Sequence, residues 1–276
     1  MARRARTNTE HYELTHETAR LSPALMGAWL DPEYELAPHV ALMGTVIRET
    51  ILAGGGFVMV MMPPRHGKTT TCAKWAPLWF LDHCPSKHVI FASYADTYAQ
   101  GWGRRVRNAA VRHADKLRFS VSPDSSSVKE WSTLQGGGMV SVGVGGQLTG
   151  RGADLFVIDD PIKDAVQANS DVWRERCWEW WQQTAFSRRE PGATVIVVMT
   201  RWHEADLAGR LLNAPEADQW RVLRFPAVAD ETDELGRLPG QPLWPERFGL
   251  DELALIRANS GSYAWESLYQ QRPSSP

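Results

Sequence analysis

The chain has 276 residues, of which 43% are hydrophobic, and at this size one large α/β domain with appendages is the expected arrangement. Its formal net charge is −2, so a polyanion must be held by a local basic patch. The three cysteines fall in no Cys-x-x-Cys or Cys/His cluster, a pattern that excludes a disulfide framework and a zinc site. No apolar run approaches the ~18 residues of a membrane span. We therefore expect a soluble intracellular protein without a membrane partner.

The first part of the chain predicts an arm, a helix and a buried strand. Residues 1–20 are polar with little periodicity, which is typical of a flexible arm or a short helix. Residues 38–53 carry apolar side chains at helical spacing and stop at three glycines, 54–56, which commonly end helices. The apolar run 57–62 has no polar alternation, so it predicts a strand of the buried, parallel type.

The same unit, an apolar strand followed by a helical stretch, recurs along the chain. The predicted strands are 57–62, 88–93, 154–159, 193–200 and 220–228. This alternation predicts a mostly parallel sheet with helices on both faces, in which ligands bind at the carboxyl ends of the strands. The Ser- and Gly-rich residues 122–152 predict a hairpin or mobile loop within the same domain, and residues 251–271 predict a last helix.

Residues 63–70, which read Pro-Pro-Arg-His-Gly-Lys-Thr-Thr, follow the first strand and open a predicted helix over 69–81. This context is that of a phosphate-binding loop, in which Lys68 reaches the β and γ phosphates and the Thr69 hydroxyl binds Mg²⁺. Met62 replaces the usual first glycine and two prolines remove backbone donors, so Arg65 and His66 are expected to compensate. The predicted ATP-binding residues are Arg65, His66, Gly67, Lys68, Thr69 and Thr70. The alternative is a helix cap with an incidental lysine.

Two carboxylates end the predicted strand 154–159. A carboxylate at the tip of a buried strand is costly unless it faces a metal or a cation, so Asp159 is the expected Mg²⁺ ligand together with Thr69. Asp160 is expected to orient and activate the attacking water. The alternative is an Asp-Asp-Pro turn that merely ends a strand.

Two further residues are candidates for catalysis. Thr200 ends the strand 193–200 and is expected to sense the γ-phosphate and to pass its loss to a helix over 204–212. Arg151 follows the glycine-rich residues 143–150, whose flexibility gives it reach into the phosphate site of a neighbouring subunit. A surface arginine in a loop is the equally simple alternative for Arg151.

A basic patch is the candidate contact for DNA. Its members are expected to lie along one helix: Arg104, Arg105, Arg107, Arg112, Lys116 and Arg118. Such a patch gives non-specific, salt-sensitive phosphate contact, whereas a solvated charged face is the alternative. Tyr34 and His39 are candidates for holding adenine.

With these residues in view, the chain resembles the large terminase subunit of tailed double-stranded DNA bacteriophages. The matching segments are residues 63–69, 92–95, 145–154, 158–161, 200–212 and 268–273. The resemblance implies a RecA-like (ASCE-type) P-loop NTPase, using ATP and Mg²⁺ to move double-stranded DNA in the host cell cytoplasm. It also implies a portal protein and a small terminase subunit as partners, and a ring homo-oligomer when active.

The expected domains are an N-terminal arm over 1–35, an ATPase core over 36–229 and a small lid with a linker over 230–276. The resemblance implies a nuclease domain after that linker, which we expect to be absent from this chain. Two other functions stay open: a helicase-like nucleic-acid-dependent ATPase, and a nucleotide-binding scaffold for assembly of a packaging complex. A small-molecule kinase is disfavoured, because no residues for an acceptor pocket stand out.

Overall fold

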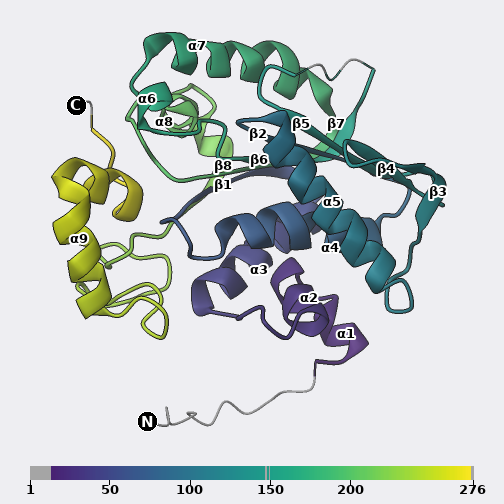
Figure 1. Ribbon diagram of the computed structural model, residues 1–276, viewed down its shortest axis with the longest axis horizontal. Coiled ribbons are helices and arrows are strands. Elements are labelled where there is room, and N and C mark those ends of the chain that lie inside the picture. Colours follow the sequence, from purple (N-terminus) through teal and green to yellow (C-terminus); the bar gives the residue numbers. More distant parts are fainter. Residues whose placement is uncertain (1–13, 147, 149, 275–276) are drawn as a thin grey trace.

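The computed structural model describes residues 14–146, 148 and 150–274, and its centre is an eight-stranded sheet of order β3-β4-β5-β2-β6-β7-β1-β8 (Figure 1). The strands β5, β2, β6, β7, β1 and β8 run parallel, as the sequence predicts for most of them. Their bounds are β1 Gly56–Met61, β2 His88–Ser93, β5 Gly138–Gly143, β6 Ala153–Asp159, β7 Arg189–Met199 and β8 Trp220–Arg224. The strand β7 lies between β1, which precedes the predicted phosphate loop, and β6, which ends at the two aspartates. This arrangement agrees with the predicted ASCE-type core.

The Ser- and Gly-rich region forms part of the sheet. The strands β3 (Val121–Ser126) and β4 (Glu130–Thr133) pair antiparallel, as expected of a hairpin. β5, which the sequence did not predict as a strand, follows within the same region and pairs parallel with β2. Its neighbour β4 pairs antiparallel with it, so the hairpin continues the sheet and forms its outer edge.

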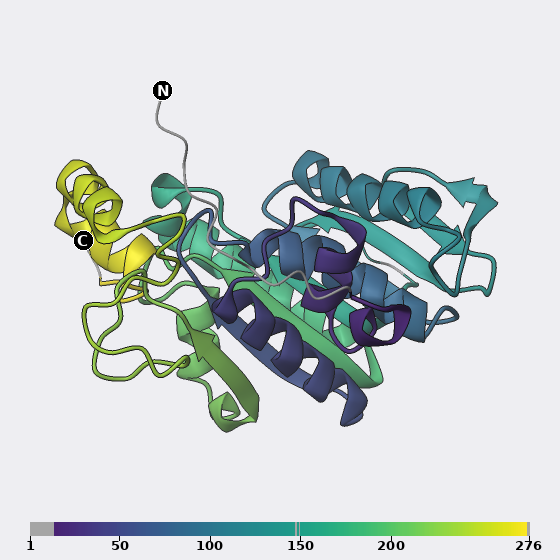
Figure 2. The same cartoon turned by 90° about the horizontal axis from the view of Figure 1, so that it is seen from below.

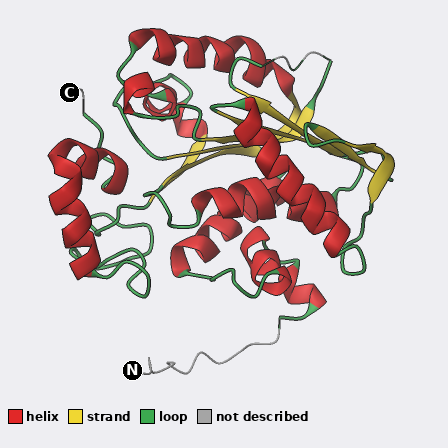
Figure 3. Cartoon of the chain, viewed as in Figure 1, coloured by secondary structure: helices red, strands yellow, loops and turns green. Residues whose placement is uncertain are grey.

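Helices cover both faces of the sheet (Figures 1 and 3). The helices of one face are α1 His16–Ala19, α2 Pro23–Leu30, α3 Pro38–Leu52, η1 Thr70–Trp75, α4 Ala76–His83 and α5 Asp96–Arg112. Those of the other face are α6 Ala165–Ala168, α7 Asp171–Trp180, η2 Trp181–Ala185, η3 Phe186–Arg188 and α8 Leu207–Leu212. Alternate side chains of β1 enter separate cores: Val58 and Val60 pack toward α3 and α4, and Met59 and Met61 pack toward the opposite layer. Burial on both faces explains why the strands read as unbroken apolar runs.

Three helix limits differ from the prediction. The helix predicted over 204–212 begins at Leu207, because the Asp206 side chain caps it by accepting from Gly209 N. The predicted last helix is interrupted at Gly261, whose φ of 74° is non-helical. The basic helix α5 ends at Arg112, so the expectation that Lys116 and Arg118 continue along it is wrong.

The last part of the chain forms a small layer beside the carboxyl edge of the parallel strands (Figure 2). It holds α9 (Leu250–Ala264) and η5 (Trp265–Tyr269), after the short turn η4 (Ala217–Gln219) and β8. A separate apolar cluster around Ala227, Leu253 and Trp265 stabilises it. Ala227 N donates to Tyr269 O (2.7 Å), and this hydrogen bond joins the first residues of the layer to its last ones. We call this layer, residues 226–272, the lid.

The N-terminal helices pack against the core. Met26 and Leu30 of α2 are buried in the same cluster as Trp79 of α4. Residues 1–13 of the predicted arm lie outside the described residues, and the three domain limits remain a prediction. Among the described residues, no helix is long and apolar enough to cross a membrane.

Candidate nucleotide-binding site

The phosphate loop predicted over residues 63–70 lies in the segment 62–69, which joins β1 to η1 at the carboxyl edge of the sheet, and in the first residue of η1. Its backbone turns through two residues with positive φ, Arg65 (63°) and Gly67 (92°). A Cβ atom at Gly67 would lie 3.2 Å from the Val40 side chain, so glycine suits this position both by conformation and by space. The loop therefore has the tight turn that a phosphate cradle requires.

His66 supports the loop from inside. Its Nδ1–H donates to Pro64 O (2.8 Å), and its own carbonyl accepts from His39 Nε2 (2.9 Å). Its ring stacks on Phe248 of the lid with centroids 4.5 Å apart. Burial lowers the pKa of His66 to about 4, so the imidazole is neutral at pH 7. The residue positions the loop between core and lid, and it is not among the residues that line the cavity described next.

Two adjoining cavities open at this loop. The first, the phosphate cavity, has a volume of about 200 Å³ and is lined by Arg65, Gly67, Lys68, Thr69, Thr70 and Arg247. The second, the side cavity, has a volume of about 240 Å³ and is lined by Asp31, Glu33, Tyr34, Glu35, Val40, Gly67, Thr70, Trp244 and Arg247. Gly67, Thr70 and Arg247 border both, so a ligand with a phosphate tail and a flat ring has room to span them.

Lys68 and the two aspartates converge beside the loop, as the sequence predicts. Lys68 Nζ lies 3.1 Å from Asp160 Oδ2, and the lysine side chain is 7% exposed. Burial opposes the charge of Lys68, but the Asp160 and Asp159 carboxylates outweigh it and raise the pKa of the lysine. Lys68 is therefore a cation held at the mouth of the phosphate cavity.

Asp159 is fully buried at the tip of β6. The Thr69 hydroxyl donates to its Oδ1 (3.1 Å), whereas Oδ2 has no hydrogen-bond partner among the described residues. Burial, and then the negative charge of Asp160, raise the pKa of Asp159 well above its usual range, against the opposing effects of Lys68 and Thr69. A buried carboxylate with a free oxygen next to a hydroxyl is a donor set that suits Mg²⁺.

Asp160 and Thr200 are joined across β6 and β7. Thr200 N donates to Asp160 Oδ1 (2.8 Å), and the Thr200 hydroxyl donates to Met62 O in the phosphate loop (3.4 Å). Asp160 has a positive φ of 41°. Its backbone N donates to Val198 O (2.9 Å), which fixes the turn. The three segments that the sequence singled out therefore meet at one point of the sheet edge.

Arg151 lies elsewhere. It precedes β6, the strand whose far end carries Asp159, and its guanidinium pairs with Glu130 of β4. It lines a cavity together with His88 and Asp154, at the starts of β2 and β6. The structure thus separates Arg151 from the phosphate loop of its own chain.

The two adenine candidates differ in position. Tyr34 lines the side cavity and its hydroxyl bonds to the Thr71 hydroxyl (2.6 Å). His39 is fully buried, and its Nε2 donates to His66 O, so it shapes the loop from behind.

Sequence reasoning missed two arginines of this region. Arg247 of the lid lies about 180 residues from the phosphate loop and only the fold brings it there; the flanking aromatic residues Trp244 and Phe248 were the available signal. Arg201 follows Thr200 and forms a buried ion pair with Asp206 through Nε (2.9 Å). The signal for this pair was Asp206 in the capping position before an apolar helix.

A family model described as terminase large subunit, T4likevirus-type, N-terminal, matches residues 59–267. The crystal structure of the HK97 bacteriophage large terminase is similar at 15% identity and a TM-score of 0.47, covering 72% of this chain and 41% of that one. The chain thus spans less than half the length of that relative, and no curated protein matches. Because the family match takes in the phosphate loop, both aspartates, Thr200 and most of the lid, the chain belongs to the terminase large subunit family.

Proposed function

We propose that this chain is an ATP-hydrolysing motor that moves double-stranded DNA into a viral prohead. The observation that carries the proposal is the meeting of Lys68, Asp159 and Asp160 at the mouth of a tight loop. A cation for phosphates, a metal-binding carboxylate and a second carboxylate for water are the parts that phosphoryl transfer needs. Membership of the terminase family supports packaging as the process.

Mg²⁺ fits the donor set of Thr69 and Asp159. The unpartnered Asp159 Oδ2 is the observation behind this assignment, because a bound cation would stabilise the ionised carboxylate that burial and the charge of Asp160 disfavour. When bound with ATP, Mg²⁺ neutralises charge on the β and γ phosphates. The Thr69 hydroxyl, already within reach of Asp159, is placed to turn its lone pairs toward the ion.

Lys68 has two possible partners in this scheme. Without nucleotide it pairs with Asp160; with nucleotide we propose that it turns to the β and γ phosphates. Asp160 then keeps its Thr200 N–H bond, which orients the carboxylate, and its other oxygen is free to accept a proton from water. Thr200 also contacts the loop through Met62 O, so loss of the γ-phosphate has a direct path to the strand that ends in Thr200.

Arg151 is proposed to act in trans, in a ring of subunits. Its separation from its own phosphate loop supports this role, and such an arginine is worth roughly 10³ to 10⁵ in rate. In the test, Arg151→Ala subunits are mixed with Lys68→Ala subunits. Each is expected to be inactive alone, and the mixture should regain hydrolysis. Failure to regain it in assemblies that demonstrably contain both subunits would exclude the trans role.

Double-stranded DNA is proposed to contact the exposed basic face of α5. Arg104 and Arg105 are exposed, while Trp102 and Val106 face the core. Such a face gives phosphate contact without sequence readout. Portal protein and a small terminase subunit are proposed as assembly partners, on the basis of the family.

The central test measures ATP hydrolysis with and without double-stranded DNA. Hydrolysis should be present in the native chain, should respond to DNA, and should be lost in Lys68→Ala while the circular dichroism spectrum is unchanged. Nucleotide binding without any hydrolysis, in the presence of DNA and partners, would favour a nucleotide-binding scaffold. Hydrolysis retained in Lys68→Ala would overturn the assignment of the phosphate loop.

A further inference from the structure

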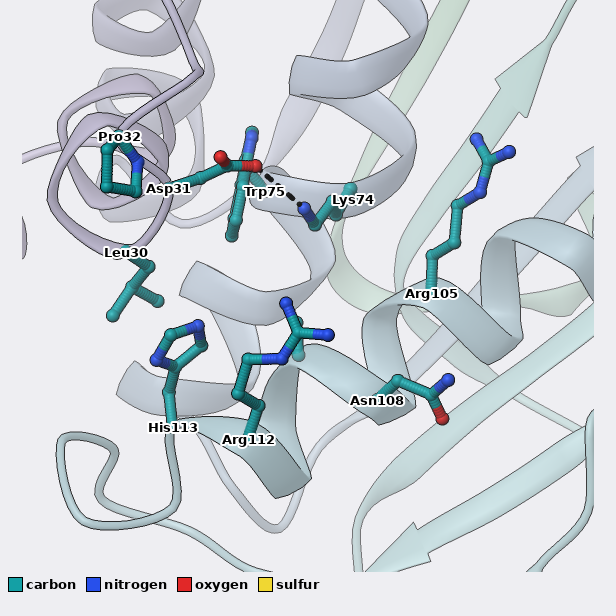
Figure 4. Close-up of a pocket in the computed structure, with 10 residues that line it drawn as sticks. Leu30, Asp31, Pro32, Lys74, Trp75, Arg105, Asn108, Arg112 and His113 are labelled. Atoms are coloured by element: carbon teal, nitrogen blue, oxygen red, sulfur yellow. Dashed lines mark hydrogen bonds and ion pairs between the residues drawn. The ribbon is translucent and has the colours of Figure 1, made fainter.

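A basic cavity lies between the end of α2, the helix η1 and the last turns of α5 (Figure 4). Its volume is about 430 Å³, within the range of small-molecule sites, which is roughly 300 to 1,000 Å³. Its lining residues are Leu30, Asp31, Pro32, Lys74, Trp75, Arg105, Asn108, Ala109, Arg112 and His113. We call it the basic cavity. Arg105 and Arg112 belong to the basic patch expected to contact DNA, but the cavity that they line together with Lys74 has no part in the proposed reaction.

Positive charge predominates in the basic cavity. Lys74, Arg105 and Arg112 line it, against a single carboxylate, Asp31. Figure 4 shows Arg112 reaching from α5 toward Lys74 and Trp75. Burial, with the nearby positive charges of Arg112 and Arg105, lowers the pKa of Lys74 despite its bond to Asp31. An anion in this cavity would relieve that repulsion.

The basic cavity is built to hold its cations in place. Lys74 Nζ lies 3.2 Å from Asp31 Oδ2 and 3.9 Å from the centroid of the Trp75 ring. The Arg105 guanidinium lies 4.3 Å from the centroid of the Trp102 ring. Burial and the charges of Lys116 and Arg112 lower the pKa of His113, so at pH 7 it offers a neutral imidazole. Fixed cations beside neutral hydrogen-bonding groups suit a phosphate group.

The basic cavity also adjoins the nucleotide site. Asp31 lines both the basic cavity and the side cavity. Its Oδ1 accepts from Glu33 N (3.2 Å), which shapes the turn that carries Tyr34. Lys74 belongs to η1, the helix that begins directly after Thr69. A change in the pairing of Lys74 and Asp31 therefore acts on a wall of the side cavity.

We propose that the basic cavity binds a phosphate group, and that this phosphate draws Lys74 from Asp31 and so alters nucleotide affinity at the adjoining site. The phosphate belongs either to a nucleic-acid backbone or to a small free anion, since both present the same oxygens. The binding step stands on the cavity alone, whereas the coupling step rests on the proposed nucleotide site. Reciprocity requires that nucleotide binding change phosphate affinity by the same factor.

Binding is tested with two probes, inorganic phosphate and a 20-base-pair DNA duplex, by calorimetry and fluorescence anisotropy. The proteins are the native chain, Arg112→Gln and, as matched control, Arg221→Gln. Arg221 is an exposed arginine of β8 that does not line the basic cavity and does not belong to the proposed DNA-contact face. Loss of a charge-assisted bond should weaken binding roughly tenfold to a hundredfold in Arg112→Gln, and much less in Arg221→Gln.

Each outcome of the binding experiment is decisive. Loss with either probe supports the site, and loss with one probe alone identifies the source of its phosphate. Equal loss in Arg221→Gln and Arg112→Gln would overturn the proposal, because the loss would then reflect the net charge of the protein and not the basic cavity. No binding of either probe to the native chain would overturn it too.

Coupling is tested by measuring the affinity for a fluorescent ATP analogue with and without the probe that binds. The affinity should shift severalfold in the native chain and should be insensitive to the probe in Asp31→Asn, which cannot form the ion pair with Lys74. No shift in the native chain would exclude coupling while leaving the phosphate site intact. Absence of analogue binding in the native chain would instead refute the proposed nucleotide site.

Discussion

Replacing Asp206 by alanine is expected to destabilise the fold severely. Asp206 is fully buried, and its carboxylate accepts from Arg201 Nε with both oxygens (3.0 and 2.9 Å). It also accepts from Gly209 N (2.9 Å), as the cap of α8, and from Trp202 N (3.2 Å). One side chain thus neutralises a buried guanidinium and closes the turn between β7 and α8.

The size of the loss follows from these two roles. Arg201 is 7% exposed and would keep weak contacts to His203 O and Glu204 O, each 3.4 Å, and to Met61 Sδ, 3.3 Å, so its charge would be left buried without a counter-ion. Breaking a buried ion pair costs about 3 to 5 kcal/mol, and losing a helix cap adds about 1 kcal/mol. A loss of about 4 to 6 kcal/mol is a large part of the roughly 5 to 15 kcal/mol of a typical domain.

The assay is urea unfolding at pH 7 with fluorescence detection. Its control is Glu175→Ala, which breaks the exposed pair between Arg210 and Glu175 (2.9 Å, Glu175 54% exposed) and should cost less than about 1 kcal/mol. The double variant Arg201→Met with Asp206→Ala should recover part of the loss, because the unpaired charge is gone. Equal, small losses in Asp206→Ala and Glu175→Ala would refute the reasoning.

Three further predictions concern the nucleotide site. Asp159→Ala should weaken Mg-ATP binding, whereas Asp160→Asn should retain binding and stop hydrolysis, because a metal ligand and a water-orienting group act at different steps; equal binding and turnover in both would contradict this division. Arg247→Ala should weaken binding of ATP analogues about tenfold or more, because one charge-assisted bond is lost. The control is Arg257→Ala, which changes an exposed lid arginine outside both cavities and should leave binding unchanged by calorimetry. The His66 imidazole should titrate near pH 4 by NMR, so its contribution to stability is present above about pH 6.5 and is lost as pH falls through 4; a midpoint near 6 would refute its burial.

The strands that were predicted from the sequence are those whose burial requires an unbroken run of apolar residues. Runs such as 57–62 are apolar on both faces because helices cover both faces of the sheet. β5 has no such run, because Gly138 and Gly143 stand at its ends and Ser141 interrupts its apolar residues. Its place is set by pairing with β2, a contact across about 50 residues. The last helix was predicted as one piece because a positive φ at Gly261 cannot be told from an ordinary helical glycine by spacing alone.

The same distinction applies to the site: its local motifs were predictable, whereas the contacts between distant segments were not. The phosphate loop and the pair of aspartates are each a short continuous segment that directly follows an apolar strand. Their meeting at one edge of the sheet was therefore predictable from topology. The pairing of Lys68 with Asp160, and the hydrogen bond from Thr200 N to the same carboxylate, could not be predicted from sequence. They depend on the register in which β1, β6 and β7 pair. The position of Arg247 could not be predicted from sequence, because it depends on how the lid packs on His66 through Phe248.

The ion pair between Lys68 and Asp160 sets a condition on any ligand of this site. At 3.1 Å and an effective dielectric constant of about 20, the attraction is about 5 kcal/mol before desolvation is considered. A ligand that takes Lys68 must therefore offer at least comparable negative charge, which a triphosphate does and a neutral molecule does not. The same exchange leaves Asp160 and Asp159 as two close carboxylates without their cation, an arrangement that favours a divalent ion at Asp159. Triphosphate binding and metal binding are therefore expected to favour each other, because the metal offsets part of the negative charge that the triphosphate and the two carboxylates bring together.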